Sequence, residues 1–110
     1  MPTLDTRAIH DGEPEPRVEG AVTLPIFQTA TYTHENPDDE VRYLRYNNTP
    51  NHKALHEKLA SLESTEDALV TSSGMAAISS ALMALLNAGD HLVAPQSLYG
   101  GTLDLFDDLL

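Results

Sequence analysis

The residues of this sequence that are best suited to chemistry are a Ser-Ser-Gly-Met stretch at 72–75 and a Tyr-Gly-Gly stretch at 99–101. An apolar run ends at the first stretch and a helical pattern begins there, so free backbone N–H groups and the helix dipole favour an anion. Gly74 lets a ligand approach the backbone of Gly74 and Met75, and Tyr99 supplies a flat ring. Together they suit a planar cofactor that carries a phosphate, although the same turn also occurs as a plain tight connection.

The elements that must hold these residues are two short strands and the helix between them. The candidate strands are residues 66–73 and 91–95, and the pattern between them predicts a helix that begins at Gly74 and closes near Gly89. We expect its buried side to consist of Ile78, Leu82, Leu85 and Leu86. Strand, helix and strand in this order predict a parallel pair with a right-handed crossover, the opening of an α/β fold. Gly74 and Tyr99 then lie at the same edge of the sheet, where ligands bind in such folds.

Two further helices are predicted on either side of this unit. Thr49 is a candidate N-cap with Pro50 at the first helical position. One face of the helix that follows is marked by the spacing of Leu55, Leu59 and Leu62. The stretch GGTLDLFDDLL at 100–110 begins a third helix.

Residues 1–48 differ from the rest, because they hold most of the prolines and show little periodicity. An unstructured segment of this length is unusual in a compact domain, so we interpret it as an extended arm that becomes ordered against something outside this chain. Its apolar anchors are Ile26, Phe27, Tyr32, Tyr43 and Tyr46. Residues 49–110 are interpreted as the first part of an α/β domain, and two strands alone predict that this is the front part of a larger protein.

Composition excludes several classes of function. The formal net charge is -11, from 17 acidic and 6 basic residues, which argues against a nucleic-acid partner because phosphate neutralisation needs clustered basic residues. The sequence has no cysteine, so disulfides and thiolate metal sites are excluded. The longest apolar stretch is too short to span a bilayer, and residues 1–20 lack the apolar region of a signal peptide. We therefore expect a cytoplasmic protein that binds no membrane.

One pair of histidines has a spacing that could bind a metal. His52 and His56 are four residues apart on the predicted helix, a spacing that can provide two zinc ligands. No third ligand accompanies them and no H-E-x-x-H pattern is present, so we predict no metal and interpret them as part of a polar helix face.

Longer stretches carry a resemblance to a known family. SSGMAAI, followed by GDHLVAPQSLYGGT, closely resembles the trans-sulfuration family of pyridoxal-phosphate enzymes, which includes cystathionine synthases and lyases, O-acetylhomoserine sulfhydrylases and methionine gamma-lyases. The resemblance continues through TRAIHDG, GAVTLPIFQTATY, YLRYNNTPNHKALHEKLASLE and LFDDLL, in the family's order. It implies the start of the large cofactor-binding domain of a fold-type I, aminotransferase-like enzyme, with pyridoxal 5'-phosphate as cofactor. It also implies C–S bond formation or cleavage on a sulfur amino acid, by beta- or gamma-elimination or replacement, in a homo-oligomer built as a dimer of dimers.

The resemblance also implies roles for five residues. Gly74 and Met75 would donate backbone N–H groups to the cofactor phosphate. Tyr99 would stack on the pyridine ring and, as a phenolate, take a proton from the substrate amine. Tyr43 and Arg45 match the family's Tyr-Ser-Arg motif, which reaches the cofactor phosphate of the neighbouring subunit, and this would explain the long arm.

The sequence departs from the family's pattern at three places. Leu44 stands where the motif commonly has serine, and Asn48-Thr49-Pro50 replaces the common Asn-Pro-Thr, which leaves the substrate open. Gly101 stands where methionine gamma-lyases usually carry cysteine, which argues against that activity.

The catalytic lysine is the main feature not found. The family's Schiff-base lysine lies further along the family's sequence, and Lys53 and Lys58 are outside any matching motif. We therefore expect the 110-residue chain alone to be inactive. The alternative is a small acidic, non-catalytic interaction module derived from the same fold.

Overall fold

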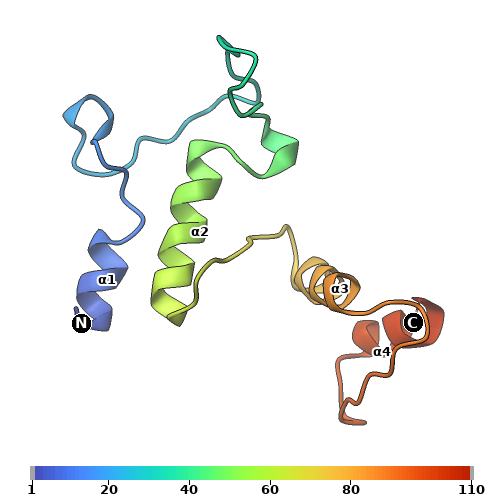
Figure 1. Ribbon diagram of the computed structural model, residues 1–110. Coiled ribbons are helices and arrows are strands. Elements are labelled where there is room, and N and C mark those ends of the chain that lie inside the picture. The colour runs from blue at the N-terminus through green and yellow to red at the C-terminus, as the bar shows by residue number, and fades with distance from the viewer. Residues whose placement is uncertain (1, 110) are drawn as a thin grey trace. The chain divides into compact units, whose positions relative to one another are not determined.

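A computed structural model describes residues 2–109, and the chain divides into two compact units, Met1–Val70 and Thr71–Leu110. Each unit is built on one pair of packed helices (Figure 1). The helices of the described residues are, in chain order, α1 (Leu4–His10), η1 (Val18–Gly20), η2 (Leu44–Tyr46), α2 (Pro50–Glu63), α3 (Gly74–Leu85) and α4 (Gly100–Leu109). None of them is long and apolar enough to cross a membrane.

The first unit contains a helix that the sequence pattern did not predict. The N-cap of α1 is Thr3, whose hydroxyl accepts a hydrogen bond from the Thr6 N–H at 3.3 Å. Figure 1 shows α1 alongside α2, with which it packs. Lys58 of α2 donates to the carbonyl oxygens of Ala8 and Ile9 at 3.1 and 3.3 Å, near the end of α1 where the helix dipole favours a cation.

Gly12 allows this close packing of the chain against α2. Its φ is +75°, and a Cβ on it would lie 2.6 Å from the Ala54 carbonyl oxygen and 2.9 Å from the Lys58 backbone nitrogen. Both atoms belong to helical backbone and cannot give way, so any side chain here would push the segment after α1 away from α2.

The predicted start of α2 is confirmed. Thr49 is the N-cap and Pro50 the first helical residue. The Thr49 side chain is 1% exposed, and its hydroxyl bonds to Nδ1 of His52 at 2.8 Å rather than to a backbone N–H. Leu55 and Leu59 are 44% and 37% exposed, so the predicted apolar face of α2 is only half covered in this chain.

The second unit confirms the helix starts at residues 74 and 100. Ser73 caps α3 with its hydroxyl, which accepts from the Ala76 N–H at 3.1 Å. The helix ends at Leu85, and Gly89, with φ +96°, lies in the turn that follows. The helix therefore ends a few residues before Gly89, where its end was expected.

The predicted buried side of α3 was wrong for Leu85, which is 77% exposed, and Ile78 is also 37% exposed. The reason is that no sheet lies beneath the helix within residues 2–109. Residues 66–73 and 91–95 run as irregular chain, and the one β-bridge within residues 2–109 pairs Thr31 with Tyr43 in the arm. The parallel strand pair is therefore not confirmed by the described part of the chain.

Candidate functional site

The start of α3 leaves two backbone N–H groups free. The Ala76 N–H bonds to the Ser73 hydroxyl and the Ala77 N–H to the Ser73 carbonyl, both at 3.1 Å. Within residues 2–109, the N–H groups of Gly74 and Met75 donate to no protein acceptor. Gly74 is exposed, and no heavy atom beyond its chain neighbours lies within 4 Å of the place of a Cβ. Both groups lie at the positive end of the helix dipole, where an anion is favoured.

The start of α4 lies against Met75. Thr102 is 6% exposed, and its hydroxyl donates to the Met75 Sδ at 3.7 Å, while its N–H bonds to the Tyr99 carbonyl at 2.9 Å. A Cβ on Gly101 would lie 3.6 Å from the Met75 Sδ and 2.8 Å from Cε1 of Tyr99. Tyr99 itself is 71% exposed. The second unit thus brings an exposed aromatic ring next to the residue that follows Gly74.

Tyr43 and Arg45 form a second arrangement, in the first unit. The Arg45 Cζ lies 5.4 Å from the centroid of the Tyr43 ring, and its Nη2 donates to the Tyr43 hydroxyl at 3.4 Å. Tyr46 packs edge-on against Tyr43, with ring centroids 5.7 Å apart at 76°. Asn47, with φ +57°, ends the turn. The guanidinium is exposed and can reach an anion outside this unit.

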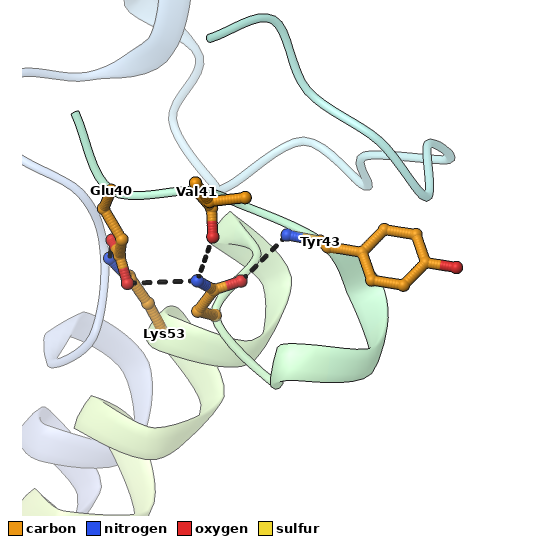
Figure 2. A network of polar contacts seen from close by, with 5 residues as sticks. Glu40, Val41, Tyr43 and Lys53 are labelled. Carbon is orange, nitrogen blue, oxygen red and sulfur yellow. Dashed lines mark hydrogen bonds and ion pairs between the residues drawn. The ribbon is translucent and has the colours of Figure 1, made fainter. Parts of the chain in front are cut away.

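A network of polar contacts holds the main chain of this turn (Figure 2). The Asn48 side-chain oxygen accepts from the Tyr43 N–H at 3.1 Å, and its NH2 group donates to the Val41 carbonyl at 2.9 Å and to Glu40 at 3.1 Å. Glu40 also pairs with Lys53 of α2 at 2.5 Å. The hydrogen bond from Lys53, followed by that from Asn48, lowers the pKa of Glu40 below its ordinary value of 4.5.

Sequence reasoning missed Asn48 and its neighbours. Asn47 donates to the Val70 carbonyl at 2.9 Å, and Asn51 bonds to both the N–H and the carbonyl of Phe27, at 3.1 and 2.9 Å. The available signal was three asparagines within five residues at the start of a helix, where asparagine side chains commonly bond to backbone groups. Together the three side chains attach distant segments of the first unit to the start of α2.

The histidine pair lies on α2. The rings of His52 and His56 are 6.3 Å apart, and Nδ1 of His52 is bonded to the Thr49 hydroxyl. Over the part of the chain that the structure describes, no group of three His, Cys, Asp or Glu side chains could hold a metal ion.

The sequence-predicted site residues fall into the two units described above. Gly74, Met75 and Tyr99 lie in the second unit, and Tyr43 and Arg45 lie in the first. The first set offers backbone donors and a ring, and the second offers a guanidinium and a phenol. Backbone N–H groups at a helix start and a guanidinium are both groups that bind phosphate.

Comparison with known proteins identifies the family. Residues 5–110 match the sequence model of the family described as Cys/Met metabolism PLP-dependent enzyme, and the chain belongs to that family. A probable cystathionine gamma-synthase of Herpetosiphon aurantiacus is 44% identical over 107 residues, which cover 96% of this chain and 33% of the relative. A cystathionine beta-lyase of Lactococcus lactis subsp. cremoris is 40% identical, over 100% of this chain and 29% of the relative.

A third relative has another named activity. The L-methionine gamma-lyase of Fusobacterium nucleatum subsp. polymorphum is 40% identical over 93% of this chain and 28% of the relative. The chain thus spans about a third of the length of the curated relatives that it matches. The family is one of fold-type I enzymes that depend on pyridoxal phosphate (PLP), which confirms the predicted family and cofactor.

The residues present fit the phosphate of this cofactor. Two free N–H groups at one helix start, at Gly74 and Met75, match the acceptor oxygens of a phosphate. The open space at Gly74 leaves the backbone unobstructed, and the exposed Tyr99 ring can cover a flat heterocycle. Nothing in the described residues of the second unit competes with an anion for these donors.

Proposed function

We propose that the protein containing this chain forms or cleaves C–S bonds of sulfur amino acids with PLP as cofactor. The reaction class is beta- or gamma-elimination or replacement, as in cystathionine synthases, cystathionine lyases and O-acetylhomoserine sulfhydrylases. The observation that carries the proposal is the contact between the start of α3, with its free N–H groups, and the start of α4. The Met75 Sδ lies 3.6 Å from the Cβ position of Gly101, and Gly101 in turn contacts the Tyr99 ring.

Each residue of the second unit has a task in this proposal. The N–H groups of Gly74 and Met75 bind the phosphate, and the Tyr99 ring stacks on the heterocycle. When bound, PLP supplies an electron sink for negative charge that develops on the substrate. The Tyr99 hydroxyl, as a phenolate, takes a proton from the substrate amine, and a cation near it would favour that form.

The Tyr43–Arg45 turn acts on the neighbouring subunit. Its guanidinium is exposed and can form charge-assisted bonds to a phosphate, for which arginine is well suited. Sharing of this kind requires a homo-oligomer, and we propose a dimer of dimers for the whole protein. A cytoplasmic location remains a prediction.

We also propose that residues 66–73 and 91–95 become strands of one parallel sheet in the whole protein. Leu85 and Ile78, exposed in this chain, would then lie against that sheet. This arrangement brings the ends of both strands to one edge, where Gly74 and Tyr99 follow them.

The experiment that tests the function uses the full-length protein with PLP. Turnover is measured with cystathionine, with an O-acylated homoserine plus cysteine or sulfide, and with methionine. We expect activity on one of the first two and little on methionine, because Gly101 replaces the cysteine typical of methionine gamma-lyases. A folded full-length protein that binds no PLP would contradict the proposal and favour a non-catalytic interaction module.

A further inference from the structure

The Tyr43–Arg45 turn is held mainly through the main chain of Tyr43 and Leu44. The Tyr43 N–H bonds to Asn48, and the N–H of the next residue, Leu44, bonds to the Ala30 carbonyl at 3.0 Å. Figure 2 shows the Tyr43 ring pointing away from the dashed contacts, and this ring lies against the Arg45 guanidinium. The position of the guanidinium therefore depends on how firmly this backbone is fixed.

Asn48 uses every part of its amide in the network. One oxygen accepts from Tyr43, and the two NH2 hydrogens go to the Val41 carbonyl and to Glu40. Glu40 in turn is paired with Lys53, which lies on α2. The contacts form a continuous connection from a helix of the first unit to the start of the turn.

We propose that Asn48 is a positioning residue for Arg45. It fixes the backbone at Tyr43 relative to α2, and thereby holds the guanidinium where it meets the cofactor phosphate of the neighbouring subunit. This inference rests on the proposed role of Arg45 and adds a residue that touches neither the cofactor nor the substrate.

The geometry requires asparagine and no similar residue. Aspartate would keep the acceptor for Tyr43 but lose both donors, and it would place a second carboxylate about 3 Å from Glu40. Glutamine keeps the amide but moves it by one methylene, so it cannot reach all three partners from the same backbone. Alanine removes all three contacts.

The test is a double-mutant cycle in the full-length enzyme, read out as the PLP dissociation constant from absorption titrations. We expect Arg45→Ala to weaken cofactor binding about 10- to 100-fold, as for loss of a charge-assisted hydrogen bond. Asn48→Ala should weaken it about tenfold. In the Arg45→Ala background, Asn48→Ala should change the dissociation constant less than about twofold, because both act through one group.

Asn51→Ala is the matched control. Asn51 also bonds to the arm from the start of α2, but to Phe27 and not to Tyr43. If Asn48 has a purely structural role, Asn48→Ala and Asn51→Ala should both lower the melting temperature and should have the same PLP dissociation constant. The proposal predicts weaker binding in Asn48→Ala only. Asn48→Gln, which leaves no unfilled volume, replaces Asn48→Ala if the latter does not fold.

Hydrogen exchange separates this inference from the proposed function. In the PLP-free protein, the Tyr43 amide should exchange at least about tenfold faster in Asn48→Ala than in the wild type or Asn51→Ala, because its acceptor is gone. Unchanged exchange, or additive losses in the cycle, would overturn the role of Asn48. Faster exchange in Asn48→Ala, together with no effect of Arg45→Ala on PLP binding, would show that Asn48 fixes the backbone at Tyr43. It would also refute the role of Arg45.

Discussion

Gly101 and the ring of Tyr99 lie so close that a Cβ on Gly101 would be 2.8 Å from Cε1 of Tyr99. The Tyr99 ring is exposed and can rotate, so a side chain at residue 101 would be accommodated only by moving that ring. The position of the proposed cofactor-covering ring therefore depends on a residue without a side chain.

Gly101→Ala is expected to displace the Tyr99 ring and weaken PLP binding a few-fold in the full-length enzyme, with lower turnover. Gly100→Ala is the matched control, because no heavy atom other than those of its chain neighbours and the nearby α4 backbone lies within 4 Å of its Cβ position. Dissociation constants and kcat of the two variants are compared. Equal effects of both substitutions would show that the Gly101–Tyr99 contact has no role.

Tyr99→Phe should bind PLP nearly normally but turn over about 10²- to 10⁴-fold more slowly, because it keeps the ring and loses the acid–base group. Tyr99→Ala should in addition weaken PLP binding, because stacking is lost. The measurement is kcat together with the cofactor dissociation constant. Full turnover by Tyr99→Phe would reduce Tyr99 to a packing residue.

Arg45→Ala subunits are expected to regain partial activity when mixed with subunits that lack the family's Schiff-base lysine. The reason is that mixed dimers would contain one site with both an intact lysine and an intact arginine from the partner. Activity is measured after confirmed subunit exchange. Tyr43→Ala should behave in the same way, and no recovery in mixed dimers would place both residues in their own subunit's site.

Glu40 should make stability depend on pH. Its pKa is lowered by Lys53 and Asn48 in the folded protein, so its contribution is present above the unfolded value near 4.5 and is lost as the pH falls through the folded value. The melting temperature of the wild type should therefore fall more steeply below about pH 4.5 than that of Glu40→Gln. Glu66→Gln is the control, because Glu66 is exposed and forms no ion pair within residues 2–109. Parallel curves for wild type and Glu40→Gln would contradict the prediction.

Helix starts were predictable because their signals are local. Thr49-Pro50 and Ser73-Gly74 carry the cap and first-turn chemistry within two residues, and both helices begin where expected. The seven-residue α1 was missed because so short a helix shows little periodicity, and its stability comes from contacts with Lys58 and other residues of α2.

Contacts within irregular chain could not be predicted in the same way. Asn48 bonds to Tyr43, Val41 and Glu40, which are close to it in the sequence, but the irregular turn between them has no periodic pattern that would specify these pairs. The strand pattern at residues 66–73 and 91–95 is typical of buried parallel strands, but such strands need neighbours and cover on both faces. The exposed Leu85 shows that the described chain does not provide that cover.

The central claim is that the free N–H groups at the start of α3 bind the PLP phosphate, and Gly74→Pro in the full-length protein tests it most directly. Proline is well tolerated at the first helical position and removes only the N–H, and Ser73 before it has the extended backbone (φ -160°, ψ 161°) that a proline requires. Gly74→Ala keeps the N–H and serves as the control. We predict that Gly74→Pro remains folded and binds PLP at least about tenfold more weakly than Gly74→Ala, as expected for a lost bond to a phosphate. Equal PLP dissociation constants for the two variants would contradict the account.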